Sequence, residues 1–330
     1  MKVLVTGAAG FIGSHLSESI QLRGDRVCCL DNLDASYPRE LKQNNLQEVL
    51  RHGSAEFIEA DICDAERLTE IFLRSKPDAV VHLAARPGVR ASIQSPSLYC
   101  DVNIGGTINV LEAARMAQVH KVVFASSSSV YGASNRVPFR EDDPLPRPES
   151  PYAGTKAAAE DMCHLYHSLH GLQVHCVRLF TVYGPRQRPD LAVSKFTSSI
   201  ASGRPVPLYG DGSAARDYTH VSDTVRGILA AVDHASPWDV FNIGSGRTIA
   251  TIDLIRSIEE AMGRRAVIEH LPPQPGDVPL TFADPDKSRA VLGYEARMPF
   301  EQGIHEFADW FRSTEARLLT ESATDVLPVS

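Results

Sequence analysis

The chain has 330 residues and a formal net charge of −8, with 43% hydrophobic and 22% charged residues. This length predicts one large domain or two coupled ones, and the acidic balance excludes attraction to nucleic acid or to an anionic membrane through the overall field. No apolar run reaches the roughly 18 residues that a membrane span needs. None near the N-terminus resembles a signal peptide, since a strand pattern begins at Lys2. We therefore expect a cytoplasmic globular enzyme that binds phosphate groups, if any, through local contacts.

Cysteine and histidine patterns give no sign of a disulfide framework or a metal site. The six cysteines, at positions 28, 29, 63, 100, 163 and 176, form no CxxC pair, and several lie in apolar segments. We interpret them as reduced, buried thiols of a cytoplasmic protein. The twelve histidines lack metal-ligand spacing, and His164, His167 and His170 are predicted to lie on the polar face of a helix. No metal site is expected.

Apolar runs alternate with helical patterns through the first part of the chain. Strands are expected at 2–6, 26–30, 56–59, 79–84, 121–125 and 174–179. Helices are expected at 11–22, from a cap at Asp61 to Ser75, at 102–117 and at 152–171. The strands are continuously apolar rather than alternating, which indicates a parallel sheet covered on both faces. The predicted fold class is α/β, a doubly wound parallel sheet (Rossmann) with a smaller C-terminal substrate-binding domain.

The second part has a different character. Prolines, glycines and short apolar pieces dominate residues 183–212, residues 239–243 predict a buried strand that returns to the sheet, and residues 272–276 form a rigid proline-rich loop. We predict a first domain over residues 1–181 plus that returning strand. A mainly substrate-binding domain over residues 182–312 and a flexible tail over 313–330 complete the expected organisation.

A glycine turn follows the first strand and opens the first helix. Its residues are Gly7, Gly10, Phe11, Ile12 and Gly13, in a GxxGxxG pattern. Glycines at this spacing allow a tight turn and close approach to a pyrophosphate, and the free N–H groups and dipole of the helix N-terminus favour the negative charge. The pattern is weak alone, but its position between a strand and a helix predicts a dinucleotide site.

An acidic residue at the end of the second strand indicates which dinucleotide is bound. Asp31 can accept hydrogen bonds from both ribose hydroxyls and would repel a 2′-phosphate, so we expect NAD rather than NADP. Neighbouring Asn32 is included in the predicted site. The pair Asp61 and Ile62 begins the segment after the third strand and is expected to border the adenine, although it also fits a simple helix cap. The small residues Leu83-Ala84-Ala85 end the fourth strand and permit close approach to the cofactor, or serve ordinary packing.

A tyrosine and a lysine, Tyr152 and Lys156, lie four residues apart on the predicted helix 152–171 and therefore share one face. A nearby ammonium, together with the positive nicotinamide ring, stabilises the phenolate and lowers the Tyr pKa toward the working pH. The hydroxyls of Ser126-Ser127-Ser128-Ser129 directly follow the strand 121–125, where the substrate of a doubly wound fold is expected, although a serine run is also typical of a polar loop.

These motifs together resemble the extended short-chain dehydrogenase/reductase family. The resemblance covers residues 1–312 and rests on the glycine turn, the stretch Ser126–Gly132, the Tyr152/Lys156 pair and Arg216-Asp217-Tyr218-Thr219-His220-Val221. It implies a catalytic set of Ser127, Tyr152 and Lys156, with Lys156 also holding the nicotinamide ribose. It implies a nucleoside-diphosphate sugar as substrate, with Arg216 on the diphosphate and Tyr218 bordering the same site. It also implies a homodimer formed through the helices 102–117 and 152–171.

Further stretches are similar to UDP-glucuronate 4-epimerases. They are the loop Ala85-Arg86-Pro87-Gly88-Val89-Arg90, the segment Arg178–Pro185, the residues Arg188-Pro189-Asp190 and Lys195-Phe196, and the loop Leu271–Pro279, which contains Asp277. In UDP-glucose epimerases the position of Thr181 is usually Asn and that of Gln274 often Arg, so the departures favour a uronic acid. The related dehydratases and uronate decarboxylases carry an acid in the serine stretch, where this chain has Ser128 and Ser129.

The resemblance implies a complete hypothesis for the reaction. Tyr152 removes the C4 hydroxyl proton, NAD takes the C4 hydride, the 4-keto sugar turns over, and NADH reduces its other face. Hydroxyls of Thr181, Ser127 and Ser128, with Arg90 or Arg188, are expected to hold the sugar carboxylate, and Pro87 and Asp277 complete the substrate site. The alternatives are a UDP-glucose 4-epimerase, an NAD-dependent UDP-glucuronate decarboxylase and a non-catalytic NAD-binding sensor. The complete Ser127/Tyr152/Lys156 set argues against the sensor.

Overall fold

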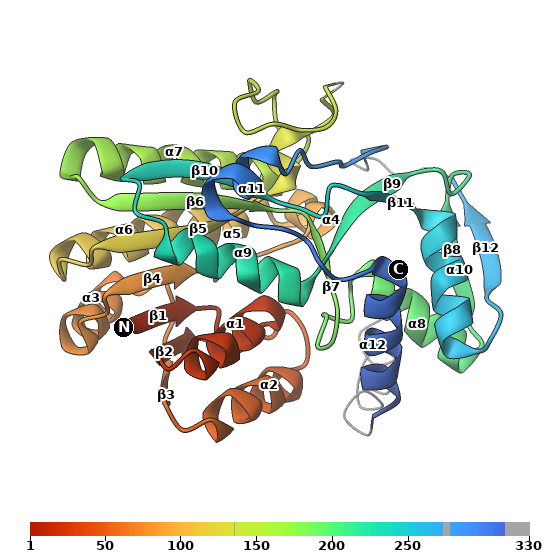
Figure 1. Ribbon diagram of the computed structural model, residues 1–330, viewed down its shortest axis with the longest axis horizontal. Coiled ribbons are helices and arrows are strands. Elements are labelled where there is room, and N and C mark those ends of the chain that lie inside the picture. Colours follow the sequence, from red (N-terminus) through yellow and green to blue (C-terminus); the bar gives the residue numbers. More distant parts are fainter. Residues whose placement is uncertain (135, 273–277, 314–330) are drawn as a thin grey trace.

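The computed structural model of the chain describes residues 1–134, 136–272 and 278–313. Within these residues, seven strands form one central sheet in which every neighbouring pair is parallel. This confirms the predicted α/β, doubly wound class (Figure 1). The order across the sheet is β10 (Trp238–Ile243), β6 (Gln173–Leu179), β5 (Lys121–Ser127), β4 (Ala79–His82), β1 (Lys2–Thr6), β2 (Arg26–Asp31) and β3 (Ala55–Glu59).

Helices cover both faces of the sheet because each strand is apolar on both sides. Successive side chains of a strand point to opposite faces, so Leu4 and Val5 of β1 belong to two separate buried clusters. The cluster that contains Val5 is covered by α1 (Phe11–Leu22), α2 (Arg39–Arg51) and α9 (Val221–Asp233). The cluster that contains Leu4 is covered by α3 (Ala65–Ser75), α6 (Gly106–Met116) and α7 (Pro151–His170).

The sequence predicted many of these elements to within two residues, and two differences matter for the site. The predicted cap at Asp61 is wrong: α3 begins at Ala65, and the Asp64 carboxylate caps it by accepting from the Arg67 amide at 3.0 Å. Asp61 instead accepts from the Cys63 amide at 2.8 Å and stabilises a turn ahead of the helix. The predicted helix 102–117 is divided into a wider π-helical turn over Asp101–Gly105 and α6.

The remaining elements form a smaller group beyond the carboxyl ends of the strands, on the right in Figure 1. The strands β7 (Thr181–Tyr183), β9 (Ala215–His220) and β11 (Thr248–Ala250) make one sheet, and β8 (Pro205–Tyr209) pairs with β12 (Val267–Leu271). A third buried cluster joins them to α8 (Ala192–Ser202), α10 (Thr251–Met262) and α12 (Phe300–Arg312). Between these pieces the chain returns to the central sheet as β10, where a returning strand was expected.

Four of the six cysteines are buried, but Cys63 and Cys100 are exposed, so the prediction of buried thiols is wrong for these two. Cys63 lies in the turn before α3, and Cys100 ends the short helix α5 (Pro96–Cys100). In the described ranges, no helix combines the length and the apolar character needed to cross a membrane. The same ranges contain no cluster of three or more His, Cys, Asp or Glu side chains arranged to hold a metal ion.

Candidate active site

A cleft of about 1050 Å³ lies where the carboxyl ends of the sheet strands meet the smaller group of elements. It is lined by every described residue that the sequence predicted for the site. Asp277 and Gln274 lie outside the described residues. The lining residues are Gly7, Gly10, Phe11, Ile12, Gly13, Asp31, Asn32, Asp61, Ile62, Leu83, Ala84, Ala85, Pro87, Arg90, Ser127, Ser128, Tyr152, Lys156, Thr181, Arg188, Arg216 and Tyr218.

The glycine turn has the shape that a pyrophosphate requires. Gly7 has φ +73°, and a Cβ there would lie 2.8 Å from the Ala84 amide nitrogen. A Cβ on Gly13 would lie 2.1 Å from the Gly7 carbonyl oxygen, so only glycine fits either position. The first turn of α1 has no side-chain cap, which leaves its amides available to an anion. The turn therefore fits the diphosphate of a dinucleotide.

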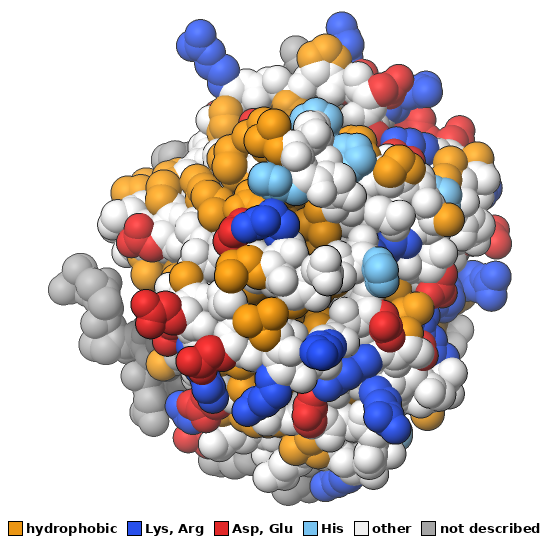
Figure 2. Space-filling model, turned by 90° about the vertical axis from the view of Figure 1, so that its left-hand side faces the viewer, with side chains coloured by type: hydrophobic (Ala, Val, Ile, Leu, Met, Phe, Trp, Pro, Cys, Tyr) orange, Lys and Arg blue, Asp and Glu red, His pale blue; other side chains and the backbone are white. Residues whose placement is uncertain are grey.

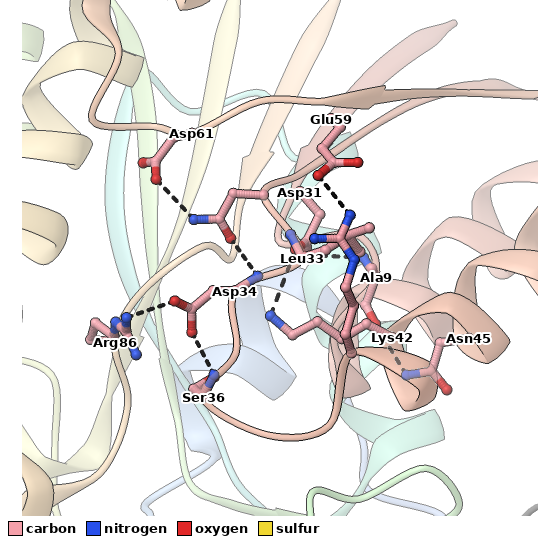
Figure 3. Close-up of polar contacts among 12 residues, drawn as sticks. Ala9, Asp31, Leu33, Asp34, Ser36, Lys42, Asn45, Glu59, Asp61 and Arg86 are labelled. Carbon is pink, nitrogen blue, oxygen red and sulfur yellow. Dashed lines mark hydrogen bonds and ion pairs between the residues drawn. The ribbon is translucent and has the colours of Figure 1, made fainter.

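Asp31 is held in place at the end of β2 by the backbone (Figure 3). Its carboxylate accepts from the Ala9 amide at 3.1 Å and from the Leu33 amide at 2.8 Å. The Lys42 ammonium is 3.8 Å from the same carboxylate, and both side chains are buried. Burial raises the pKa of Asp31 and lowers that of Lys42, while their mutual attraction opposes both shifts. Sequence analysis missed Lys42 because α2 has few apolar residues and was not predicted.

Asn32 and Asp61 border the cleft next to Asp31. The Asn32 side-chain amide donates to the Asp61 carboxylate at 2.9 Å, which links the ends of β2 and β3 (Figure 3). Nearby, the Arg86 guanidinium bonds the Asp34 carboxylate at 2.6 Å. Arg86 and Asp34 also line the cleft, and neither was in the predicted site. Along this edge of the cleft, Asp31 is therefore paired with Lys42 and Asp34 with Arg86.

Tyr152 enters the cleft from the first turn of α7. This helix begins at Pro151, directly before Tyr152. The Ser150 hydroxyl caps it by accepting from the Ala153 amide at 3.1 Å, and proline favours the first helical position. A hydrogen bond with the Ser127 hydroxyl lowers the pKa of the Tyr152 phenol, as does the charge of Arg188, but burial has the larger, opposite effect and raises it.

Lys156 lies one helical turn below Tyr152 and is buried. Its ammonium donates to the Ala125 carbonyl at 2.8 Å, at the end of β5. Burial lowers the pKa of this amine from 10.5 to about 8. Beside it, the Ser126 hydroxyl is used for structure, since it bonds the buried Glu160 carboxylate, which in turn pairs with Arg178 at 2.7 Å. All four serines of the stretch line the cleft.

The opposite side of the cleft comes from the second half of the chain. Thr181 begins β7, Arg216 and Tyr218 belong to β9, and Arg188 lies in the connection from β7 to α8. The Arg188 guanidinium bonds both carboxylate oxygens of Asp190, at 3.0 and 2.8 Å. Arg90, from α4 (Val89–Gln94), lies over the ring of Tyr209 with 5.0 Å between guanidinium carbon and ring centroid. Tyr209 and Lys195 line the cleft as well and were not predicted.

A parallel doubly wound sheet, a glycine turn and a tyrosine–lysine pair in one cleft define a dinucleotide-dependent enzyme of the short-chain dehydrogenase/reductase class. Comparison narrows this class. The chain belongs to the NAD dependent epimerase/dehydratase family, whose sequence model matches residues 3–244. NAD is therefore its cofactor, as the glycine turn and Asp31 predicted.

Individual relatives are similar over nearly the whole chain. A UDP-glucuronate 4-epimerase of Thermodesulfobacterium geofontis is 39% identical over 308 residues, which cover 93% of this chain and 95% of that protein. The crystal structure of a UDP-glucuronic acid 4-epimerase from Bacillus cereus, in complex with UDP-glucuronic acid and NAD, is 35% identical with a TM-score of 0.89, covering 96% of this chain and 100% of that one. A Thermus thermophilus UDP-glucose 4-epimerase in complex with NAD is 36% identical with a TM-score of 0.87, covering 95% and 100%.

Proposed function

We propose that this protein is an NAD-dependent 4-epimerase that interconverts UDP-glucuronate and UDP-galacturonate through a 4-keto intermediate. The observation that carries the proposal is the set of side chains around Tyr152. The hydroxyls of Ser127, Ser128 and Thr181 line the same cleft as the Tyr152 phenol, together with the Arg188 guanidinium. Such a set can bind both a sugar hydroxyl and a carboxylate. The similarity to UDP-glucuronate 4-epimerases supports the same substrate.

In the proposed enzyme the glycine turn binds the NAD pyrophosphate, and Asp31 with Asn32 binds the adenosine ribose. Asp61, Ile62 and the strand end Leu83–Ala85 border the rest of the cofactor. NAD supplies a reversible hydride acceptor, which is regenerated in each turnover. It therefore remains bound as a resident group.

Tyr152 acts as general base and then general acid at the C4 oxygen. The Ser127 hydroxyl, which already bonds the phenol, shares the hydrogen bond to the reacting hydroxyl. Lys156 holds a positive charge below the phenol and stabilises its ionised form. Because burial raises the Tyr152 pKa, the hydrogen bond from Ser127 and the charge of Arg188 are needed to offset the cost of forming a buried phenolate.

The sugar carboxylate must be kept out of alignment with the C4 ketone, because a β-keto acid decarboxylates when its C–CO₂ bond lies parallel to the carbonyl π system. Thr181, Ser128 and Arg188 supply donors for this purpose from two sides of the cleft. Arg216 is proposed to bind the diphosphate, Arg90 is a further candidate donor to the carboxylate, and Tyr218 and Pro87 border the nucleotide sugar.

The product of UDP-glucuronate tests the proposal. The protein, incubated with UDP-glucuronate and followed by NMR, is expected to form UDP-galacturonate without a pentose product. Formation of UDP-xylose or a 4-keto pentose would instead identify a decarboxylase. Turnover of UDP-glucose with none of UDP-glucuronate would identify a UDP-glucose 4-epimerase, and no turnover of either would favour a sensor.

We also propose a cytoplasmic homodimer that pairs α6 and α7 with the same helices of a second copy. The exposed apolar side chains Met116, Leu165 and Leu169 on these helices support this, with Leu169 71% exposed. Figure 2 looks at the end of the molecule where α6 and α7 finish, and hydrophobic side chains gather there beside several histidines. The unpaired state of all six cysteines agrees with a reducing compartment. A Leu165→Glu, Leu169→Glu variant that keeps the mass of the wild-type protein in light scattering would argue against this pairing.

A further inference from the structure

The connection between β7 and α8 delivers Arg188 to the cleft. We call residues 184–190 of this connection the arginine loop. Arg188 is held by two local contacts: its guanidinium bonds Asp190, and its carbonyl accepts from the amide of Leu191, directly after the loop, at 3.2 Å. From this position Arg188 lines the same cleft as Tyr152, and its charge lowers the pKa of the Tyr152 phenol. The position of Arg188 in the cleft therefore depends on where this loop is held.

The arginine loop is fastened to α1, the helix whose first turn lines the cofactor part of the cleft. The Arg186 guanidinium pairs with the Glu18 carboxylate at 2.9 Å between Nη1 and Oε1, and Nη2 donates to Oε2 at 3.1 Å. One turn earlier, the His15 Nε2–H donates to the Pro185 carbonyl at 2.9 Å. Glu18 and His15 are three residues apart and so lie on the same face of α1.

These contacts are largely shielded from water. The side chains of Glu18 and Arg186 are only 15% and 17% exposed. Burial and the neighbouring Arg186 charge lower the pKa of His15 to about 3, so the imidazole is neutral at physiological pH and keeps its single donor on the Pro185 carbonyl. An exposed ion pair contributes little, whereas removal of one partner of a shielded pair leaves the other charge without compensation.

The backbone of the arginine loop shows that it is held rather than relaxed. Arg186 has φ +65°, a left-handed conformation that costs a residue other than glycine some strain. Gly184 has φ +136°, and a Cβ there would lie 2.8 Å from Val221 and 2.9 Å from His220. The Gln187 side chain donates to the Val182 carbonyl at 2.9 Å and accepts from the Ser194 amide at 3.1 Å. In this conformation Arg186 contacts α1 and Arg188 lines the cleft.

We propose that Glu18, assisted by His15, is a positioning residue of the active site that fixes Arg188 beside Tyr152 through its ion pair with Arg186. The pair joins the helix that begins at the cofactor turn to the loop that carries a substrate-binding arginine. The substrate used to test this inference rests on the proposed function, whereas the contacts among Glu18, His15 and the arginine loop do not depend on it.

A double-mutant cycle in the NAD-loaded protein tests this inference. Glu18→Gln is made alone, Arg188→Gln is made alone, and the two are combined. If Glu18 acts through Arg188, we expect Glu18→Gln to lower kcat/KM for UDP-glucuronate about 10-fold in the wild-type background and less than about 2-fold when Arg188 is already replaced. Glu18→Asp, which keeps the carboxylate, is expected to recover part of the loss. NAD content and thermal midpoint are measured for each variant to verify folding.

Asp233→Asn is the matched control, because it removes a carboxylate that pairs with Arg23 at the other end of α1, at 3.1 Å and away from the cleft. It is expected to leave kcat/KM unchanged. Equal losses from Glu18→Gln in both backgrounds, or no loss in either, would overturn the inference. If the wild-type protein proves to turn over another UDP-sugar, the proposed function fails, while the same cycle measured on that sugar still decides the role of Glu18.

Discussion

The cofactor side of the cleft is built from the strand ends of one parallel sheet, whereas the sugar side is built from a loop and short strands of the second half. Asp31 and Lys156 are fixed by backbone groups at the ends of β2 and β5. The loop that carries Arg188 instead contacts α1 through Arg186 and Glu18, which are 168 residues apart. The first side therefore follows from local pattern and sheet geometry, and the second depends on long-range contacts.

The largest effect is expected where the two sides meet. Tyr152→Phe removes the proton-transfer group but keeps the ring, so we expect the epimerisation rate to fall about 10²- to 10⁴-fold. NAD content is expected to stay at the wild-type level, because the cofactor side is untouched. Conversion of UDP-glucuronate, followed by NMR, measures this, and a variant with full activity would refute Tyr152 as the base.

A methyl group in the cofactor turn is expected to disrupt the cofactor side alone. Gly13→Ala would bring a Cβ to 2.1 Å from the Gly7 carbonyl oxygen, so the turn must open. We expect loss of bound NAD after purification, measured by absorbance of the released cofactor. Gly105→Ala is the control, because the nearest atom to its Cβ is 4.0 Å away, and it is expected to retain NAD. Equal NAD content in both variants would mean that the turn does not bind the pyrophosphate.

Asp31→Asn is expected to have a smaller effect, on cofactor affinity, and it tests the role of charge on the cofactor side. Loss of a charged hydrogen-bond acceptor is expected to weaken NAD binding about 10-fold. NADP binding is expected to improve relative to NAD, because the buried Lys42 ammonium remains and no longer faces a carboxylate. Calorimetric titration of cofactor-free protein measures both. Glu59→Gln is the control, because it removes a half-exposed carboxylate that pairs with Arg39, and it is expected to change neither the NAD nor the NADP affinity.

The last expected effect concerns stability in acid rather than activity or binding, and it arises beneath the cofactor turn. His82 is buried between the hydroxyls of Thr6, at 2.7 Å, and Thr107, at 3.1 Å, and burial lowers its pKa from 6.5 to about 3. The unfolded chain therefore takes up a proton below pH 6.5 that the folded chain refuses until about pH 3. Stability should decrease over this interval as pH falls, by ~1.4 kcal/mol per pH unit for this histidine.

Denaturant unfolding at several pH values measures that slope. His82→Asn is expected to flatten it, and the exposed His52→Gln is expected to leave it unchanged. A His82→Asn variant with the wild-type slope would show that the acid sensitivity arises elsewhere, for example at His15, whose pKa is also about 3.

The sequence predicted the sheet because its strands are continuously apolar, and it predicted the cofactor residues because parallel strands end at one edge. The pattern of apolar residues did not predict α2, because its sequence is mostly polar, and this helix brings Lys42 to Asp31. Local pattern also failed at Asp61, which resembles a helix cap but stabilises a turn. For the sugar side, only the resemblance identified Thr181, Arg188 and Arg216. No local pattern could have identified Glu18, since its partner belongs to another part of the fold.

The return of the chain to the sheet as β10 has a consequence for synthesis of the protein. The buried cluster around Val5 is completed by Val225 and Ile228 of α9 and by Phe241 of β10. Until residue 233 is made, the part of this face that α9 covers is exposed. Until residue 243 is made, β6 also has an unpaired edge. Exposed strand edges of this kind promote association between chains. The nascent protein is therefore expected to need protection, by a chaperone or by rapid elongation, until three quarters of its length has emerged.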